Sequence, residues 1–440
     1  MADPDVIVIG GGASGLAAAT ELARRGWRVR ILEARARLGG RIYSMKPKGW
    51  PVPIELGAEF VHGGTKEVRD LLPLRRIETK MWRFEQGQLT ETPGYWEMIG
   101  KVAAKIPRRD RGWSFEDFLR HERGRIAPDV AKLAAAYAGS FNAAPIDQIS
   151  AHALREHRAG ADTEDFKVAA RYDSLVTRLR KQWPKGRVEV GLESVVKRIR
   201  WDEGSAIVQT GTKSHAARAA IITLPLGVLK ANHVKFFPPL AEKQSIIRRA
   251  GWGQVIRVVF RFRPGFWTSP MMPQALGMGQ GSAFGFINAP SEAVPVWWAL
   301  MPPSPVLTGW VGGEAANQLA RLTPNGVREK AIGSLANIFS ATRQQVKGWL
   351  ADWRFHDWRR DPFSLGAYSF PVAGQENIPE RLAEPVRSTL FFCGEATAAE
   401  YGTVHGAVES GTRAAREVGA VLEKAALGNT PPVTPFPVGI

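Results

Sequence analysis

The sequence predicts a two-domain α/β fold with a Rossmann-like dinucleotide-binding domain. The chain has 440 residues, which is longer than a single hydrophobic core usually grows. An apolar run leads directly into closely spaced glycines at residues 6–15, as in the first strand and turn of a nucleotide-binding sheet. Further along, residues 245–355 alternate strand-like segments with short turns rich in proline and glycine, which indicates a second sheet.

The N-terminal segment DVIVIGGGASGLAAATELARRGWRVRILEAR is typical of a strand, a turn, a helix and a second strand. Gly10, Gly12 and Gly15 have the spacing G-x-G-x-x-G. The first glycine permits the tight turn, the second lets the backbone approach a pyrophosphate, and the third lets the helix pack closely on the strand. Free N–H groups at the start of the helix then bind the phosphates.

An acidic residue completes this unit. Glu33 ends the second strand, 18 residues after Gly15, where a carboxylate accepts hydrogen bonds from ribose hydroxyls. A second glycine turn, LGGRI at 38–42, follows, and we expect Arg41 to reach the same pyrophosphate. Because strand, helix, strand and acid occur in the required order, the sequence predicts dinucleotide binding.

Composition and charge limit the classes of protein that fit. The formal net charge of +17 predicts attraction to polyanions or to an acidic membrane face. The basic residues are scattered without interleaved aromatic residues, so we expect no specific nucleic-acid partner. Without an apolar run of about 18 residues or a signal peptide, we expect no transmembrane anchor and a cytoplasmic protein. The single cysteine, Cys393, excludes an internal disulfide and a Cys-rich metal site, and we expect it in the core.

Several motifs together resemble those of the flavin-containing amine oxidases, a family that includes monoamine oxidases, polyamine oxidases and lysine-specific histone demethylases. The sequence carries G-x-G-x-x-G, then EAR at 33–35, GGR at 39–41 and ELGAEFVHG at 55–63. The resemblance covers most of the chain and implies FAD as the cofactor. Ala367 stands where monoamine oxidases have the cysteine that bonds to flavin, so the resemblance implies noncovalent FAD.

The resemblance also implies a domain organisation. It predicts a Rossmann-like FAD-binding domain with an inserted substrate-binding domain of mixed sheet and helices. The FAD-binding domain comprises 1–75, 186–244 and 356–425, the substrate-binding domain 76–185 and 245–355, and 426–440 form a loose tail. In the first inserted piece, Ser114 is a plausible N-cap with Asp117 three residues later. Of the 15 tryptophans we expect most in the core and one or two in the substrate passage.

The C-terminal stretch GEATAAEYGTVHGAVESG at 394–411 is expected to meet the flavin. Gly394 would let the backbone approach the cofactor, and Glu395 would contact its ribityl or phosphate side. A helix is expected from Val404 to Val418, with its N-terminus aimed at the flavin edge where reduction places negative charge. The residues expected to contact FAD are Gly10, Gly12, Ala13, Ser14, Gly15, Glu33, Ala34, Arg35, Gly40, Arg41, Gly57, Ala58, Glu59, Val196, Trp358, Gly394, Glu395, Thr403 and Val404.

By resemblance, the reaction takes a hydride equivalent from the carbon beside an uncharged amine to flavin N5, with O2 then reduced to H2O2. Tyr368 matches an aromatic-cage tyrosine of the family, and Thr403 holds the second cage position. His62 resembles the pocket histidine of animal polyamine oxidases, and Glu59 is placed to face a cationic substrate. For both, hydrogen bonding to backbone is the alternative. The net positive charge favours a small or aromatic monoamine over a polyamine.

Arg257 departs from the family pattern, because the family usually has a lysine there that holds a water on flavin N5. Arginine is longer, planar and forked. It would position a water, bind a substrate carboxylate or reduce oxygen reactivity. The expected partners are an amine and O2, and a homodimer is one expected assembly.

Three other functions remain as alternatives to the amine oxidase. The first is an L-amino-acid oxidase, and the second is an O2-independent flavin dehydrogenase or desaturase; both would use the same fold. The third belongs to another class, a basic FAD-bearing protein that binds nucleic acid or membrane.

Overall fold

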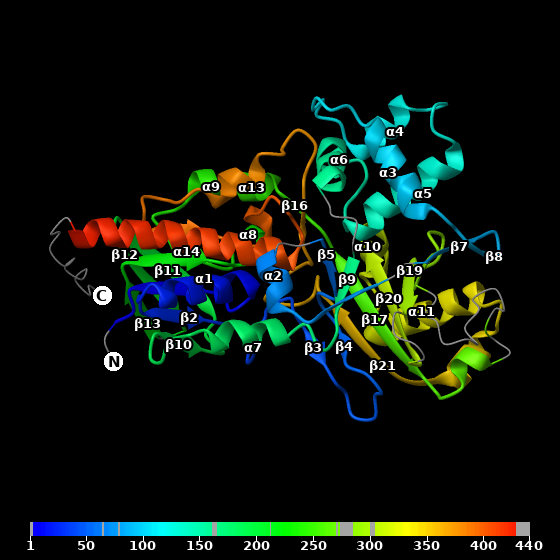
Figure 1. Ribbon diagram of the computed structural model, residues 1–440, viewed down its shortest axis with the longest axis horizontal. Coiled ribbons are helices and arrows are strands. Elements are labelled where there is room, and N and C mark those ends of the chain that lie inside the picture. Colours follow the sequence, from blue (N-terminus) through cyan, green and yellow to red (C-terminus); the bar gives the residue numbers. More distant parts are fainter. Residues whose placement is uncertain are drawn as a thin grey trace.

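The computed structural model describes residues 3–63, 66–77, 80–160, 165–211, 213–269, 272, 285–299 and 304–427. Figure 1 shows the N-terminal helix α1 and the long C-terminal helix α14 on one side of the molecule, with the second sheet and its helices on the other. This arrangement confirms the predicted mixed α/β architecture with a Rossmann-like unit. No helix in the described part of the chain has the length and apolarity needed to cross a bilayer.

A five-stranded parallel sheet carries the nucleotide-binding unit. Its order is β10-β2-β1-β14-β23, and every neighbouring pair is parallel. The central strands are buried on both faces, as their continuous apolar runs predict. The strands are β1 (Val6–Ile9), β2 (Val29–Leu32), β10 (Val188–Gly191), β14 (Ala219–Ile222) and β23 (Leu390–Phe392).

Different layers cover the two faces of this sheet. Helices α1, α7 and α14 share one apolar core with it, and buried Cys393 belongs to that core as expected. Burial raises the pKa of the Cys393 thiol to about 12. The mixed sheet β13-β12-β11-β15 covers the other face and contains the hairpin of β11 and β12. These elements are α1 (Ala13–Arg24), α7 (Ser174–Lys181), α14 (Val404–Leu427), β11 (Val196–Asp202), β12 (Ser205–Thr210), β13 (Lys213–Ala217) and β15 (Lys235–Phe237).

The second domain is built on a seven-stranded mixed sheet with the order β21-β17-β20-β19-β18-β7-β8. On β17, Ile256, Val258 and Phe260 point into the core beneath α11. Because side chains alternate along a strand, Arg257 points to the opposite face. The elements are β7 (Met81–Glu85), β8 (Gln88–Glu91), β17 (Val255–Phe262), β18 (Gly285–Asn288), β19 (Val296–Ala299), β20 (Val306–Gly312), β21 (Leu350–Asp357) and α11 (Pro324–Ile338).

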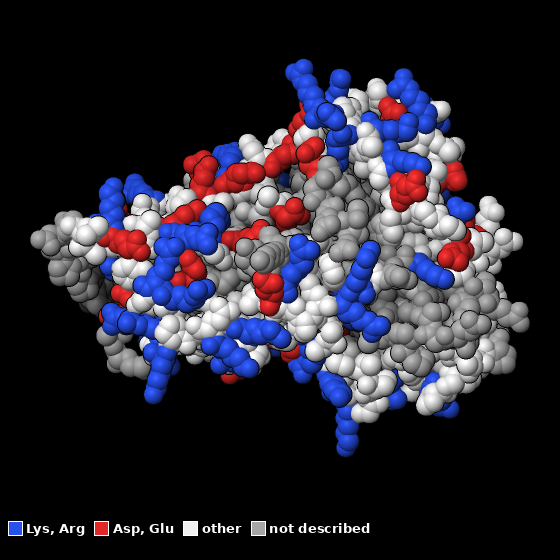
Figure 2. All heavy atoms as spheres, viewed as in Figure 1, with Lys and Arg blue, Asp and Glu red and all other residues white. Residues whose placement is uncertain are grey.

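Four helices cover that opposite face and lie at the top of Figure 1. They are α3 (Tyr95–Lys105), α4 (Phe115–His121), α5 (Pro128–Phe141) and α6 (Ala151–Gly160). Their apolar sides pack against Phe286 and Trp298 of the sheet. Figure 2 shows Lys and Arg side chains projecting from this part of the molecule.

Short elements connect the two domains and close their edges. The three-stranded sheet β5-β9-β6 joins segments that lie far apart in sequence. The remaining strands are β3 (Ser44–Met45), β4 (Ile54–Glu55), β5 (Phe60–His62), β6 (Leu74–Arg76), β9 (Asp165–Val168), β16 (Gly251–Trp252) and β22 (Ser369–Phe370). The remaining helices are α2 (Lys66–Leu71), α8 (Leu226–Lys230), α9 (Ala241–Arg249), α10 (Glu314–Leu319), α12 (Arg343–Trp349), α13 (Ile378–Ala383) and the 3₁₀ turns at Phe266–Thr268 and Glu395–Thr397.

The structure extends one expected helix, and the packing of α7 bears on an expected domain boundary. Helix α7 packs on α1, and the Trp183 indole donates a hydrogen bond to the Thr20 hydroxyl at 2.9 Å. We therefore propose that the first inserted piece ends before β9, not at residue 185. Helix α14 continues past the expected end at Val418 to Leu427, because its apolar face continues along the sheet core. The rest of the expected tail, 428–440, lies outside the described residues.

The capping box at Ser114 is confirmed. The Asp117 backbone N–H donates to the Ser114 hydroxyl at 3.1 Å, and the Ser114 backbone N–H donates to the Asp117 carboxylate at 3.2 Å. Ser114→Ala should lower the free energy of unfolding by about 1 kcal/mol, because the first turn of α4 loses its acceptor. Urea denaturation followed by circular dichroism measures this. Ser214→Ala, at an exposed strand position, is the control; equal loss in both variants would contradict a capping role.

Candidate active site

A large cavity of about 1330 Å³ runs between the two domains and contacts both sheets. It is larger than pockets that hold one drug-sized ligand, about 300–1,000 Å³, so it has room for a dinucleotide and a second molecule. Of the residues expected at the site, the cavity is lined by Gly10, Gly12, Ala13, Ser14, Glu33, Ala34, Arg35, Gly40, Arg41, Gly57, Ala58, Glu59, His62, Val196, Arg257, Trp358, Tyr368, Glu395, Thr403 and Val404.

Two expected residues, Gly15 and Gly394, do not line this cavity. A Cβ on Gly15 would lie 2.0 Å from the Gly10 carbonyl oxygen, so Gly15 provides the close helix-to-strand packing that its motif predicts. Gly394 has a φ of +143°, and its N–H donates to the Ser410 hydroxyl at 3.0 Å. This glycine therefore serves the backbone conformation between β23 and α14, and its approach to the cofactor stays a prediction.

The cradle at Gly12 fits the pyrophosphate of a dinucleotide. A Cβ on Gly12 would have no protein atom closer than Gly40 Cα at 4.0 Å, so the space above it is open. Helix α1 begins at the next residue without a side-chain cap. Its first N–H groups thus face the cavity, where an anionic group satisfies them and gains from the helix dipole.

Glu33 lies at the end of β2 with its carboxylate fixed by backbone. Its Oε2 accepts from the Gly11 N–H at 2.7 Å, and its Oε1 accepts from the Arg35 N–H at 2.8 Å. The side chain is buried but borders the cavity. Each carboxylate oxygen keeps a lone pair, which is the acceptor that a ribose hydroxyl requires.

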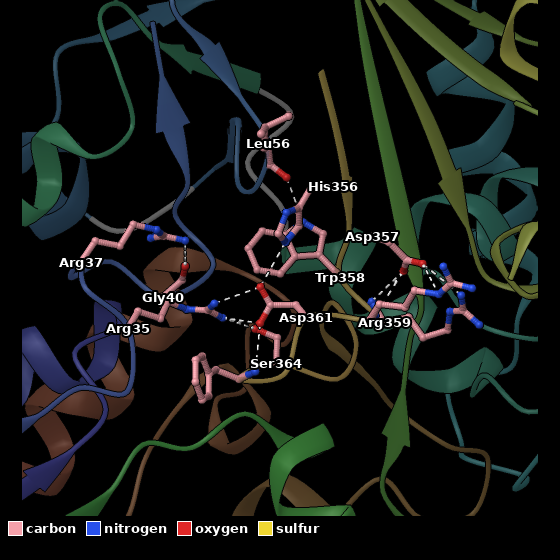
Figure 3. A network of polar contacts seen from close by, with 12 residues as sticks. Arg35, Arg37, Gly40, Leu56, His356, Asp357, Trp358, Arg359, Asp361 and Ser364 are labelled. Carbon is pink, nitrogen blue, oxygen red and sulfur yellow. Dashed lines mark hydrogen bonds and ion pairs between the residues drawn. The ribbon is translucent and has the colours of Figure 1, made fainter. Parts of the chain in front are cut away.

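Arg35 is committed to protein partners, as Figure 3 shows. Its guanidinium donates to both oxygens of Asp361, at 2.9 and 2.6 Å, and to the Ser364 hydroxyl at 3.1 Å. Burial alone would raise the pKa of Asp361, but its contacts with His356 and Arg35 hold that pKa well below its usual range. The pair therefore fixes the loop that follows β21 against the end of β2.

The same loop positions Trp358. Its indole N–H donates to the Leu56 carbonyl at 2.9 Å, and the His356 ring packs edge-on against it with centroids 4.2 Å apart. Trp358 is 3% exposed and presents one side to the cavity. The indole is thus a rigid wall between the dinucleotide cradle and the second sheet.

Glu395 and Arg41 form a second buried pair. The Arg41 guanidinium donates to Glu395 Oε1 at 2.9 Å and to the Ala367 carbonyl at 2.6 Å. Glu395 Oε2 accepts from the Ser369 hydroxyl at 2.6 Å and from the Gly402 N–H at 3.1 Å. Glu395 therefore joins three segments of chain at the cavity wall.

Arg257 is 1% exposed and points from β17 into the centre of the cavity. Its guanidinium donates to the Gly57 carbonyl and to Glu59, and lies 5.0 Å from the ring centroid of Trp298. The other Glu59 oxygen is 2.7 Å from Lys167 Nζ. Burial lowers the pKa of Lys167 to about 8 and that of Arg257 to about 9, so both remain largely cationic at neutral pH.

This geometry changes the expectation for Glu59. Its carboxylate is already paired with two cations, so it offers no uncompensated negative charge to a cationic substrate. Lys167, on β9, was not expected at the site. No local signal marks it, because its contact with Glu59 depends on the pairing of β5 with β9.

Aromatic side chains form the walls on the side of the second domain. The rings of Tyr368 and Trp310 stack at 6.4 Å and 19°, and the Tyr368 hydroxyl donates to the Phe141 carbonyl at 2.6 Å. Burial raises the pKa of Tyr368. The other aromatic lining residues in this region are Phe60, Trp96, Tyr137, Phe141, Phe286, Trp298 and Tyr401. Trp298 and Trp310 thus line the passage, whereas Trp267 and Trp297 belong to the core.

Thr403 serves the start of α14. Its hydroxyl donates to the Glu400 carbonyl at 2.7 Å and accepts from the Gly406 N–H at 3.0 Å, as a helix N-cap does. His62 lines the cavity from an exposed position on β5. Arg257 is therefore the buried member of the expected catalytic set, whereas Tyr368 and Thr403 are half-buried.

Comparisons with known proteins agree with this geometry. The family described as "Flavin containing amine oxidoreductase" matches residues 102–419, and an "NAD(P)-binding Rossmann-like domain" matches residues 8–73. Polyamine oxidase 3 of Oryza sativa subsp. japonica is 29% identical over 94% of this chain and 89% of its own length. Cyclohexylamine oxidase from Brevibacterium oxydans superposes with a TM-score of 0.76 at 20% identity, covering 96% of this chain and all of its own. A redesigned putrescine oxidase superposes with a TM-score of 0.76 at 22% identity, covering 95% of this chain and 99% of its own.

Proposed function

Since this chain belongs to the flavin containing amine oxidoreductase family, we propose that it oxidises a primary or secondary amine to an imine, which water hydrolyses to an aldehyde or ketone. The protein is a flavin-dependent enzyme of the amine oxidase type, and FAD is its cofactor. When bound, FAD supplies the redox chemistry by accepting a hydride equivalent at N5 from the carbon beside the amine and passing the electrons to O2, which gives H2O2.

One observation carries the proposal. The dinucleotide cradle and the aromatic chamber open into the same cavity. Gly12, Glu33 and Val196 lie at its FAD-binding end, and Tyr368 with Trp310 forms the other end. Trp358 and Arg257 lie between them as buried walls. This order supports a small apolar substrate that would bind next to the reactive part of FAD.

The chain's own residues favour the uncharged amine. A buried aromatic chamber penalises an ammonium ion, so an amine that enters it loses its proton more readily. Helix α14 begins at Val404 on the cavity wall. The partial positive charge of that helix end stabilises negative charge that develops on the reduced cofactor.

The amino-acid oxidase is the second candidate because Arg257 is a cation in the chamber. Its guanidinium, however, already donates to the Gly57 carbonyl and to Glu59. A substrate carboxylate would have to displace a buried ion pair to reach it. We therefore propose amines, not amino acids, as substrates.

The test is anaerobic stopped-flow absorbance of the purified yellow protein against primary amines, secondary amines, polyamines and amino acids, followed by mixing with aerated buffer. At least one amine should bleach the flavin, and air should restore it. If no amine bleaches the flavin, the proposed function is wrong. If an amino acid reduces the flavin most efficiently, the L-amino-acid oxidase replaces the amine oxidase as the proposed function.

Arg257→Lys should speed reoxidation by O2 about tenfold and leave the rate of reduction within about threefold. A compact ammonium holds water more readily than a planar guanidinium that is already committed to two partners. Arg261→Lys, the same change on the same strand outside the cavity, is the control and should alter neither rate. Equal reoxidation rates in all three proteins would show that Arg257 does not limit the reaction with O2.

A further inference from the structure

The charged groups around the aromatic chamber define which amines it accepts. At this end of the cavity, the described lining residues include two carboxylates, Glu59 and Glu97. A substrate with a second ammonium group needs a free carboxylate to hold that group, because an unpaired charge in an apolar chamber is costly. Whether either carboxylate is free therefore decides the substrate class.

The inner carboxylate is not free. Glu59 is 7% exposed and is shared between Arg257 and Lys167. The Trp298 indole N–H lies 3.3 Å from the same Oε2 that Arg257 contacts. Three donors thus surround one carboxylate, and the two cations outnumber it.

The outer carboxylate is paired as well. Glu97 Oε1 lies 2.7 Å from Lys101 Nζ, one turn along α3. Both side chains are more than two-thirds exposed, so they mark the open end of the chamber. Another cation, Arg155, lines the same end. The Arg155 guanidinium is fixed there by the carbonyls of Ala104 and Ile106, at 2.8 and 2.7 Å.

Among the described residues that line the substrate end, the cations Lys101, Arg155 and Arg257 outnumber the carboxylates Glu59 and Glu97. Lys167 adds a further positive charge beside Glu59. Like charges juxtaposed in a partly desolvated site are a means of rejecting a ligand. We propose that the substrate is an apolar or aromatic monoamine, and that this excess of cations disfavours diamines and polyamines. The inference rests on the amine oxidation proposed above and specifies its substrate class.

A matched pair of substrates tests the inference. Hexylamine and hexane-1,6-diamine have the same carbon chain and differ only in the distal ammonium. Anaerobic flavin reduction should be at least tenfold more efficient with hexylamine, expressed as the limiting rate divided by the apparent Kd. An equal or greater efficiency with the diamine overturns the inference but leaves amine oxidation intact. Failure of every amine to reduce the flavin would instead overturn the proposed function.

A charge reversal at the open end provides the second test. Lys101→Glu removes the partner of Glu97 and adds a carboxylate, so it should raise the efficiency with hexane-1,6-diamine relative to that with hexylamine about fivefold. Lys105→Glu is the matched control, because Lys105 is exposed on the same helix and does not line the cavity. If both variants improve the diamine equally, the net charge of the protein is responsible and the cavity lining is not.

Discussion

Glu59→Leu should lower the free energy of unfolding by about 3–5 kcal/mol, because it leaves Arg257 as a buried cation without its carboxylate. Arg257 is 1% exposed, and among the described residues its side chain bonds only to Glu59 and the Gly57 carbonyl. The remaining carbonyl cannot compensate a full charge at that depth. Urea denaturation of the FAD-loaded protein, followed by circular dichroism and by flavin fluorescence, measures the loss.

A double variant that removes both partners tests whether the lost stability comes from the unpaired charge of Arg257 or from the loss of the Glu59 side chain itself. Glu59→Leu combined with Arg257→Met should recover most of the lost stability, since an apolar pair of similar volume replaces a buried ion pair at little net cost. Glu97→Gln serves as the exposed counterpart and should leave the midpoint unchanged. A single Glu59→Leu variant as stable as the wild type would mean that water reaches Arg257.

Gly12→Ala should weaken FAD binding at least about 100-fold, which corresponds to about 2.7 kcal/mol. The added methyl group occupies the space over the start of α1 where the pyrophosphate would lie. It meets no protein atom closer than 4.0 Å, so the apoprotein should fold normally. Titration of apoprotein with FAD, followed by quenching of flavin fluorescence, gives the affinity, and thermal unfolding of the apoprotein gives its stability.

Two glycines serve as controls for this variant. Gly348→Ala also meets no atom within 4 Å but lies on α12, outside the cavity, so it should change neither quantity. Gly15→Ala should prevent folding, because its Cβ would lie 2.0 Å from the Gly10 carbonyl oxygen. Unchanged FAD affinity in Gly12→Ala would refute the prediction that the pyrophosphate binds over Gly12.

The sequence predicted best what depends on neighbouring residues. The first strand, turn and helix and the capping box at Ser114 were all correct, because spacing and local hydrogen bonding determine them. The end of α14 was predicted less accurately. It depends on which core an apolar helix face joins, and helical periodicity does not specify the partner.

The ion pairs of the site could not be predicted from the sequence. Glu59 and Arg257 were both singled out, yet their pairing across 198 positions was not predicted. Lys167 was missed because strand pairing alone brings it to Glu59. Gly394 was assigned to the cofactor from its place next to a buried strand, and its φ of +143° adds a backbone role that the sequence did not predict.

The close approach of the first and last helices has a consequence for the order of events during synthesis. A Cβ on Gly411 of α14 would lie 2.1 Å from the Ser14 carbonyl oxygen, so α14 rests directly on the first turn of α1. Glu395, Thr403 and Val404 complete the cavity wall from the same C-terminal stretch. Because this stretch is synthesised long after the glycine-rich turn at residues 10–15, the turn becomes a finished binding site only once the stretch has been added and α14 has packed on α1. We therefore expect FAD loading to follow the synthesis of this stretch.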